Sequence, residues 1–263
     1  MKKQKESYSA GYSSEIINDF QKRTIYKEAL FFQKYLNSNM KVLDCGCGPG
    51  SISMGIAEFL KDGYIILTDI KKGQLEIAKN EAKRRNLENI EYVQCDIYNL
   101  PFENSSFDAV FSHAVLQHLS NPQKAINEMY RVLKPHGVLG IRDDDADSLL
   151  IYPYTRRMKS IISYIKRLIP NNGGNPNIGK KYKEFLTRAG FKHIICTASC
   201  GYDSDSDSIH NRADVALKLI EKAGQEFQMS IEKVEKMKKD IKKWRDSPFS
   251  FSCITWCEGI GIK

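Results

Sequence analysis

The sequence predicts an α/β fold in which helices cover both faces of a doubly wound, mostly parallel sheet of seven strands. Strand-like and helical segments alternate between residues 41 and 142, as they do in chains that build a parallel sheet. A turn with three glycines follows the first of these strands directly, at residues 46–50. The chain closes on a further strand-like segment, residues 249–263, which we expect to run antiparallel to the others.

The spacing of apolar residues predicts the elements of the first half. Residues 13–36 carry apolar side chains three and four positions apart, which is typical of a helix. Short apolar segments predict strands at 41–45, 64–69, 90–95, 107–112 and 137–142. Helical spacing between these strands predicts helices at 51–60, 74–85 and 122–133.

The last third has a different layout. Helices are predicted at 154–169 and 178–189, separated by a turn-rich break, and strands at 191–199 and 249–263. An insertion from about residue 203 to 248 holds two further helical stretches. We expect a single domain over residues 1–263, with extra helices at its front and a helical lid before the final strand.

The composition is that of an ordinary globular protein. Hydrophobic residues make up 41% and charged residues 27%, which argues against wholesale disorder. No apolar run approaches the ~20 residues that span a bilayer. Residues 1–10 lack the apolar stretch of a secretory signal, so we expect a cytoplasmic protein with no membrane partner. Nothing in the sequence indicates an oligomeric state.

The net charge and the cysteines by themselves exclude few classes of protein. The formal net charge is +8, but the densest lysine cluster, residues 233–245, alternates with acids as on a solvated helix face. The seven cysteines are scattered and odd in number, which favours reduced thiols over a disulfide framework.

The stretch VLDCGCGPGSIS, residues 42–53, carries the strongest functional signal. A buried strand ends at Asp44, and three glycines then turn the chain into a helix. Glycines let the backbone approach a ligand where a side chain would block it. Ligands of such sheets bind beyond the carboxyl ends of the strands.

Two acids add to this signal. Asp69 ends the second strand, where an acid can bind two ribose hydroxyls, and Asp96 follows the third strand, where it can accept a hydrogen bond from an adenine amine. The segments DCGCGPG, CDIYNLPFENSSFD, VLQHL and EMYRVLKPHG occur in this order along the chain.

In this combination the sequence resembles the class I S-adenosylmethionine-dependent methyltransferases. More narrowly, it resembles the ubiquinone/menaquinone-biosynthesis type of small-molecule methyltransferase. The resemblance covers residues 12–145 closely and the remainder loosely. One departure is His136, where the family usually has a glycine before Gly137; we expect the turn to tolerate it.

The resemblance implies a Rossmann-like methyltransferase fold and S-adenosylmethionine as cofactor. It divides the chain into an N-terminal helical cap (1–36), a cofactor-binding core (37–145) and an acceptor-side half (146–263) whose lid lies at about 203–248. The implied reaction is an in-line displacement that moves a methyl group to a small-molecule acceptor, for which the protein aligns the reactants and excludes water.

The resemblance also implies roles for individual residues. Gly46, Gly48 and Gly50 would lie under the methionine and ribose parts of the cofactor. Asp69 would hold the ribose, Asp96 with the Ile97 backbone the adenine, and His113 would border the sulfonium. The remaining residues of the implied cofactor site are Tyr12, Asp44, Cys47, Ile70, Gln74, Cys95 and His118.

Two residues are candidates for proton transfer. His113 follows the fourth strand and could act as a base, although lining the cofactor without proton transfer stays open. Residues 143–145 are three adjacent aspartates, whose mutual repulsion can raise a pKa. We expect Asp143 to face the acceptor pocket; an exposed loop is the alternative. Tyr8 or Tyr12 could close the site, or simply pack against it.

The lid insertion predicts an acceptor that is apolar or aromatic in part. Its apolar residues are Ile209, Val215, Leu217, Ile220, Phe227 and Met229.

Three alternative functions are a nicotinamide-dependent oxidoreductase, a protein-directed methyltransferase and a methyltransferase that acts on nucleic acid. A nicotinamide-dependent oxidoreductase would also place an acid after its second strand, but its glycines usually follow Gly-x-Gly-x-x-Gly, and Ser51 occupies that last position. A protein-directed methyltransferase stays possible. A nucleic-acid substrate is not expected, because residues 112–115 lack the Asn/Asp-Pro-Pro-aromatic turn of enzymes that methylate base amines.

No metal site is expected. The pairs Cys196/Cys200 and Cys253/Cys257 lie on two predicted strands and could approach each other, but buried apolar thiols are the better interpretation. Residues 203–207 resemble a calcium loop only superficially, because the sixth position is Ser208 instead of glycine.

Overall fold

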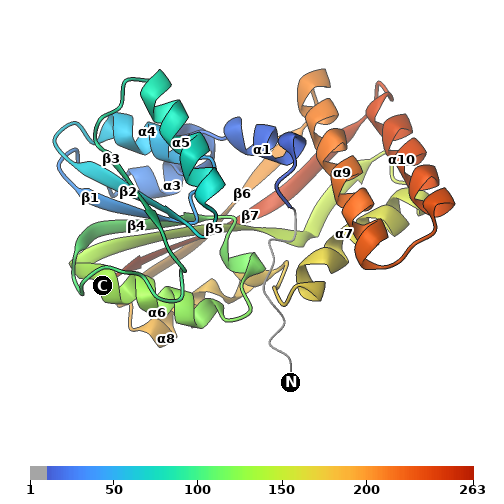
Figure 1. Ribbon diagram of the computed structural model, residues 1–263. Coiled ribbons are helices and arrows are strands. Elements are labelled where there is room, and N and C mark those ends of the chain that lie inside the picture. The colour runs from blue at the N-terminus through green and yellow to red at the C-terminus, as the bar shows by residue number, and fades with distance from the viewer. Residues whose placement is uncertain (1–10) are drawn as a thin grey trace.

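The structure, a computed structural model, describes residues 11–263, so Tyr8 lies outside the described residues. A seven-stranded sheet runs through the molecule in the order β3-β2-β1-β4-β5-β7-β6 (Figure 1). The strands are β1 (Lys41–Cys45), β2 (Tyr64–Asp69), β3 (Ile90–Gln94), β4 (Phe107–His113), β5 (Leu133–Tyr152), β6 (His193–Asp203) and β7 (Phe251–Ile262).

The pairing of the strands confirms the predicted mostly parallel sheet. Strands β1 to β5 pair in parallel, while β7 runs antiparallel to both β5 and β6. The order in which strands are added to the sheet reverses at β1, with β2 on one side and β4 on the other, so the carboxyl ends of β1 and β4 lie where ligands of open α/β sheets bind.

Helices cover both faces of the sheet around β1. On one face lie α2 (Ile25–Glu28), α3 (Leu30–Gln33), α4 (Ser51–Phe59) and α5 (Lys72–Arg84), whose buried residues form a core with Val42, Ile65 and Phe111. On the other face lie α6 (Pro122–Val132) and α8 (Tyr182–Ala189), which pack on Leu43, Val110 and Leu139. Two short 3-10 helices, η1 (Leu116–His118) and η2 (Ile178–Lys181), lie on the connections.

A third apolar core, called the lid core below because it includes the two helices of the insertion at about 203–248, lies between three helices. The helices α7 (Arg156–Asn171), α9 (Ser206–Glu226) and α10 (Ile231–Arg245) pack beside the far ends of β5, β6 and β7 (Figure 1). Ile161, Ile220 and Ile241 are fully or nearly fully buried in this core. The two helices predicted in the insertion are therefore confirmed, and α1 (Ser14–Gln21) contacts α9 from the opposite side.

Strand β5 is much longer than the predicted segment 137–142. Past Arg142 it stays paired with β7 through Asp145, and after an irregularity pairs again from Leu150 to Tyr152. Residues 143–145 are therefore part of a strand and not an exposed loop. The row of aspartates obscured this continuation, because carboxylates are uncommon inside strands.

The predicted helix over residues 13–36 is broken into α1, α2 and α3. Thr24 ends the continuity because its backbone is extended and its hydroxyl accepts a hydrogen bond from the Lys27 amide, which begins α2. His136 adopts the left-handed conformation, with φ of +65°, and its amide donates to the Lys263 carbonyl oxygen over 3.0 Å. The turn thus accommodates His136 in a conformation that favours glycine.

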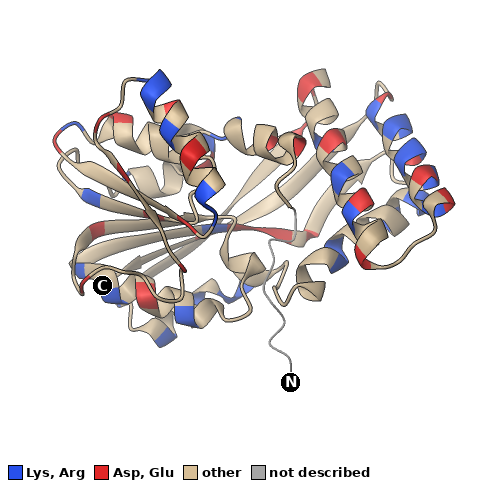
Figure 2. Ribbon diagram, in the orientation of Figure 1, with Lys and Arg blue, Asp and Glu red and all other residues tan. Residues whose placement is uncertain are grey.

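Charged side chains gather on the outer faces of the helices, as Figure 2 shows for α5 and α10. The lysines of α10 alternate with acids on its exposed side, while Met237, Ile241 and Trp244 face the lid core. The cluster at 233–245 is therefore a solvated helix face, as predicted. Within residues 11–263, no helix has both the length and the apolarity that crossing a bilayer requires.

Candidate functional site

Two positions of the turn after β1, those of Gly46 and Gly50, leave no room for any residue other than glycine. Gly46, Gly48 and Gly50 all have positive φ, at +78°, +54° and +77°. A Cβ on Gly46 would lie 2.5 Å from Val115 Cγ2, and a Cβ on Gly50 would lie 2.8 Å from Ala78 Cβ. Around Gly48, by contrast, a Cβ would meet only Gln74 Oε1, at 3.9 Å. The turn therefore leaves room above Gly48 for a ligand to touch the backbone.

Asp69, at the carboxyl end of β2, is tied to this turn. Its Oδ2 accepts a hydrogen bond from the Gly48 amide over 3.0 Å, and its Oδ1 accepts one from the Lys71 amide over 2.8 Å. Burial raises the pKa of Asp69, although these amides oppose the shift. The carboxylate is thus held beside the glycine turn, as a group that binds vicinal hydroxyls requires.

Tyr12 lies over the same acid. The ring of Tyr12 is 5.7 Å from Lys71 Nζ, and burial together with the charge of Asp69 raises the pKa of its hydroxyl to about 12. Tyr12 therefore lies close to the carboxyl end of β2.

Gln74 supplies a further polar atom there. This residue is only 4% exposed, and its Oε1 has no hydrogen-bond partner in the part of the chain that the structure describes. A buried, unpaired oxygen beside an open glycine turn fits a bound molecule with hydrogen-bond donors.

The residues expected around an adenine lie at the ends of β2 and β3. Ile70 is 60% exposed and follows Asp69, where an apolar side chain can cover a flat ring. The Cys95 amide donates to the Asp69 carbonyl oxygen, and Asp96 is exposed, with Oδ1 accepting from the Tyr98 amide. Ile97, next to Asp96, packs its side chain against the core on the α6 side. These groups and the glycine turn share one edge of the sheet.

Asp44 and Cys47 stabilise the glycine turn through hydrogen bonds to neighbouring residues. Asp44 is buried, accepts a short hydrogen bond from the Ser53 hydroxyl, and has its pKa raised to about 7, first by burial. The Cys47 amide donates to the Thr68 carbonyl oxygen, and burial raises the pKa of its thiol well above the ordinary value. The geometry gives both residues a part in holding the turn.

A cavity of about 1120 Å³ opens beside this edge. Ala114, Gln117 and His118, which follow β4, line it together with α1, α7, α9 and the extended ends of β5, β7 and β6. Its size is that of a ligand pocket. Val115 joins the two regions, because it touches the glycine turn at Gly46 and lies between two cavity-lining residues.

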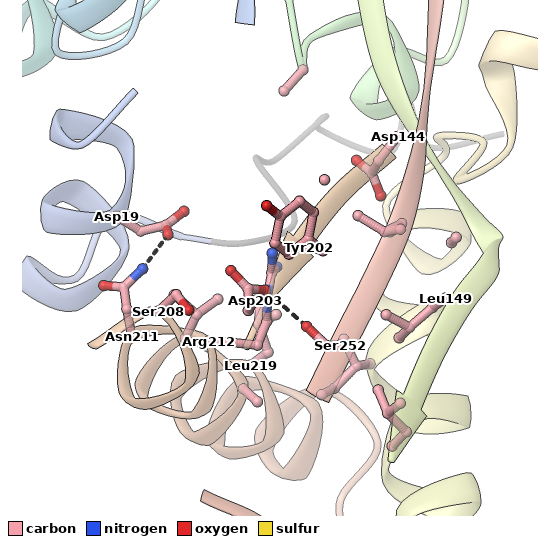
Figure 3. A pocket seen from close by; sticks show the side chains of 18 of the residues that line it. Asp19, Asp144, Leu149, Tyr202, Asp203, Ser208, Asn211, Arg212, Leu219 and Ser252 are labelled. Atoms are coloured by element: carbon pink, nitrogen blue, oxygen red, sulfur yellow. Dashed lines mark hydrogen bonds and ion pairs between the residues drawn. The ribbon is translucent and has the colours of Figure 1, made fainter. Parts of the chain in front are cut away.

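One side of the cavity is polar, as Figure 3 shows. Arg212 of α9 donates to Asp203 of β6 over 2.8 Å, and Ser252 of β7 donates to the same carboxylate. Asn211, the neighbour of Arg212, donates to Asp19 of α1 over 2.5 Å (Figure 3). These bonds connect α9 to α1 and to the sheet, so the lid is fastened on two sides.

The other side of the cavity is apolar. It is formed mainly by α7, with Met158, Ile161, Ile162 and Ile165, and by Leu149 and Ile151 of β5.

His113, at the carboxyl end of β4, is buried and is not among the residues that line the cavity. Its ring stacks on Trp256 at 5.0 Å between centroids, and both ring nitrogens lack hydrogen-bond partners among the described residues. Burial, and then the charges of Arg23 and Arg142, lower its pKa well below the ordinary value. His113 is therefore neutral, and Trp256 stands between it and the cavity.

His118 lines the cavity itself. Burial, followed by the charges of Arg23 and Lys222, lowers its pKa to about 3, so this histidine is also neutral near pH 7.

Asp143 does not face the cavity, and that expectation is wrong. Its side chain is 1% exposed, with Oδ2 accepting from the Tyr182 hydroxyl over 2.6 Å and Oδ1 from the Gln117 amide. Successive residues of a strand point to opposite faces, so the next residue, Asp144, is the one that lines the cavity. The sequence pattern identified the correct part of β5, but it chose the aspartate that points to the face of the sheet away from the cavity.

Two further expectations need correction. Of the six apolar insertion residues, only Val215 lines the cavity, whereas Ile209, Ile220 and others pack in the lid core. Cys196 and Cys200 are exposed, not buried, because they lie on β6, an edge strand that is only partly covered. Residues 11–263 contain no group of three His, Cys, Asp or Glu side chains placed to hold a metal ion.

Sequence reasoning missed the polar wall altogether. The missed residues are Asp19, Arg23, Asn211, Arg212 and Trp256. They come from α1 and the turn that follows it, from α9 and from β7, which meet only in the folded chain. A signal was present in the helical spacing of α9, which places Ser208, Asn211, Arg212 and Val215 on one side of the helix.

Comparison with known proteins gives the chain a family. A family model described as a methyltransferase domain matches residues 36–250. An uncharacterized methyltransferase of Schizosaccharomyces pombe is 29% identical over 209 residues, covering 76% of this chain and 75% of the relative. A demethylmenaquinone methyltransferase of Oceanobacillus iheyensis is 28% identical over 179 residues, covering 68% of this chain and 72% of the relative.

Solved structures share the fold. A Bacillus halodurans protein described as a methyltransferase superposes with a TM-score of 0.62 at 20% identity, covering 90% of this chain and 98% of the other. A phosphoethanolamine N-methyltransferase of Haemonchus contortus, solved in complex with S-adenosyl-L-methionine, has a TM-score of 0.52 at 18% identity, covering 88% of this chain and 50% of the other.

Proposed function

Because the chain belongs to the methyltransferase-domain family, we propose that it transfers the methyl group of S-adenosylmethionine to a small molecule held in the lid cavity. The observation that carries this proposal is the adjacency of two sites. A glycine turn with an acid beside it opens at the sheet edge, and Val115, which packs against that turn at Gly46, lies in the segment from Ala114 to Gln117 that borders the cavity.

The residues around the turn fit an adenosyl sulfonium compound. The Asp69 carboxylate can accept from ribose hydroxyls, and the unpaired Gln74 Oε1 can accept from an ammonium or hydroxyl group. Ile70 can cover one face of an adenine ring, and Asp96 can accept from its amine. When bound, the cofactor supplies an electrophilic methyl group, and the chain orients it and keeps water away.

The cavity favours a small acceptor over a protein. An acceptor in it would be flanked by α1, α7 and α9, and a hydrogen bond from Asn211 to Asp19 ties α9 to α1. Relatives named for demethylmenaquinone and sterol substrates agree with a small-molecule acceptor.

The test is a transfer assay with methyl-labelled S-adenosylmethionine. The purified protein is incubated with a size-fractionated cell extract, and label is followed in the small-molecule and protein fractions. We expect label in the small-molecule fraction together with S-adenosylhomocysteine. Label confined to protein would favour the protein-directed alternative, and hydride transfer from a nicotinamide cofactor without methyl transfer would contradict the proposal.

A further inference from the structure

Strand β6 forms one edge of the sheet and is paired on one side only. It follows β7 at the end of the strand order, and no strand of residues 11–263 pairs with its other side. A strand in this position leaves about half of its backbone N–H and C=O groups without a partner in the sheet. The free edge runs over His193–Asp203, which at eleven residues span about 36 Å.

This edge lacks the features that usually keep an edge strand unpaired. Natural edges are protected by lysine or proline residues, by bulges or by a covering helix or loop. Residues 194–202 of β6 read IICTASCGY and contain neither proline nor a Lys, Arg, Asp or Glu side chain. The register with β7 is regular throughout, and residues 195–198 are exposed in succession, so both faces of the strand are uncovered there. A long, uncharged edge of this kind is a template for pairing with another strand.

The sequence of β6 is complementary to itself when two copies run antiparallel. A two-fold axis at Ala198, the central residue of the strand, gives the longest overlap of the two copies. In such an interface each pair of opposed residues occurs twice. On one face of the joined sheet the opposed pairs are Ile194 with Tyr202 and Cys196 with Cys200, and on the other face they are His193 with Asp203, Ile195 with Gly201 and Thr197 with Ser199.

The opposed side chains fit one another in size and polarity. Tyr202 is 69% exposed in the single chain, and Ile194 of a second copy would cover it. Aromatic and β-branched side chains that lie opposite each other stabilise antiparallel strands. Ile195, which is 45% exposed, lies opposite Gly201, which has no side chain to clash with it. No like charges face each other along the strand, so none of the opposed pairs destabilises the interface by repulsion.

The charges that flank β6 favour an antiparallel arrangement of two copies. The exposed Lys192 precedes the strand, and the exposed Asp205 and Asp207 follow it. Antiparallel pairing brings the basic start of each strand beside the acidic end of the other, at both ends of the interface. Parallel pairing would instead bring the aspartates of the two copies together.

We propose that two copies of the chain form a dimer in which their β6 strands pair antiparallel about a two-fold axis at Ala198. The two seven-stranded sheets then become one continuous sheet, and the free backbone groups of both edges bond each other. The glycine turn follows β1, four strands away from β6, so it lies apart from this interface. The dimer does not depend on the proposed function.

The mass of the purified chain in solution is the first test. Light scattering after size-exclusion chromatography, over a dilution series, should give twice the 30.1 kDa of one chain. The mass of one chain throughout the series would overturn the proposal. Aggregates of many sizes would also overturn it, because a two-fold interface closes at two copies.

Charged substitutions at Ala198 test the position of the axis. Because the axis places this exposed residue opposite itself, Ala198→Lys should bring two ammonium groups together and weaken the dimer at least 10-fold. Ala198→Glu should weaken it likewise, and an equimolar mixture of the two variants should restore a dimer. Circular dichroism verifies that each variant is folded.

Leu150→Lys is the matched control. Leu150 is 64% exposed but lies on β5, two strands from the edge, so this variant should remain a dimer. Dissociation of Leu150→Lys but not of Ala198→Lys would place the interface on the face of the sheet and overturn the proposal. A mixture of the two Ala198 variants that stays monomeric would overturn the position of the axis.

Thiol cross-linking tests the register of the two strands. The proposed register places Cys196 of each copy opposite Cys200 of the other, so bis-maleimidoethane should join two wild-type chains, and peptide mapping should identify this pair. Cys196→Ser and Cys200→Ser should each lose the link. A mixture of the two variants should regain it, since a mixed dimer keeps one Cys196 opposite one Cys200. A dimer that yields this link neither in the wild type nor in the mixture would overturn the register.

Discussion

The carboxylate of Asp69 accepts a hydrogen bond of 3.0 Å from the backbone amide of Gly48. This bond links the end of β2 to the turn after β1, which are 21 residues apart in the sequence. It places an acceptor group beside the one glycine of the turn that has open space around it.

Replacing Asp69 with alanine should weaken binding of S-adenosylhomocysteine by about 1–3 kcal/mol, because ribose hydroxyls would lose a charged acceptor. Isothermal titration calorimetry measures the change. Asp62→Ala is the control, since that acid lies before β2 and bonds only Ser38 among the interactions that the structure shows. Equal affinity in Asp69→Ala and wild type would remove Asp69 from the site.

Replacing Gly46 with alanine should weaken cofactor binding at least 10-fold. The new Cβ would clash with Val115, and a φ of +78° costs an L-residue about 1–2 kcal/mol. Gly73→Ala is the matched control, because nothing lies within 4 Å of its Cβ position in α5. That control should bind normally and gain up to about 1 kcal/mol in free energy of unfolding. Similar affinities for the two variants would contradict the assigned geometry.

Replacing His136 with glycine should raise the free energy of unfolding by about 0.5–1 kcal/mol, because the left-handed conformation at φ +65° is strained for histidine. Urea denaturation measures the gain. Asn86→Gly, at φ +56°, provides the comparison and should gain less, since asparagine tolerates this conformation better. A loss of stability in His136→Gly would show that the imidazole contributes more than its backbone costs.

Replacing Asp143 with asparagine should change how stability depends on pH. Burial raises the pKa of Asp143 to about 7 in the folded chain, from 3.8 when it is exposed. The folded state therefore binds more protons than the unfolded state between these values, and its stability falls as pH rises through that window. Above about pH 7 the penalty is constant.

The asparagine side chain cannot ionise, so this penalty is absent from the variant. The free energy of unfolding of Asp143→Asn relative to wild type should thus rise between pH 4 and pH 7, by on the order of 1–4 kcal/mol. Paired thermal or urea denaturation at several pH values measures the difference. A difference that does not change with pH would mean that Asp143 titrates normally in the folded chain.

The sequence predicted the arrangement of the glycine-turn edge of the sheet better than that of the cavity. Gly46, Asp69 and Asp96 follow consecutive strands of a parallel sheet, and the order of such strands places their carboxyl ends together. Local pattern and a general rule of topology were therefore enough to bring these residues to one edge.

The acceptor half depends on contacts between distant segments. Asp19 meets Asn211, and Asp144 is opposite Trp256, across separations that no local spacing encodes. Which of Asp143 and Asp144 faces the cavity depends on the register of β5 with β7, and a shift of one residue exchanges the two faces. The apolar residues of the insertion were expected to line the acceptor pocket. Most of them instead form the core between α7, α9 and α10, because helices that pack on one another bury apolar side chains between them.

The central claim is that the turn at residues 46–50, with Asp69 beside it, binds an adenosyl sulfonium compound. Isothermal titration calorimetry of the purified chain with S-adenosylhomocysteine tests it most directly, with NAD as the competing ligand. The account predicts one molecule of S-adenosylhomocysteine bound per chain and no heat from NAD. A folded chain, verified by circular dichroism, that binds NAD or neither compound would contradict it.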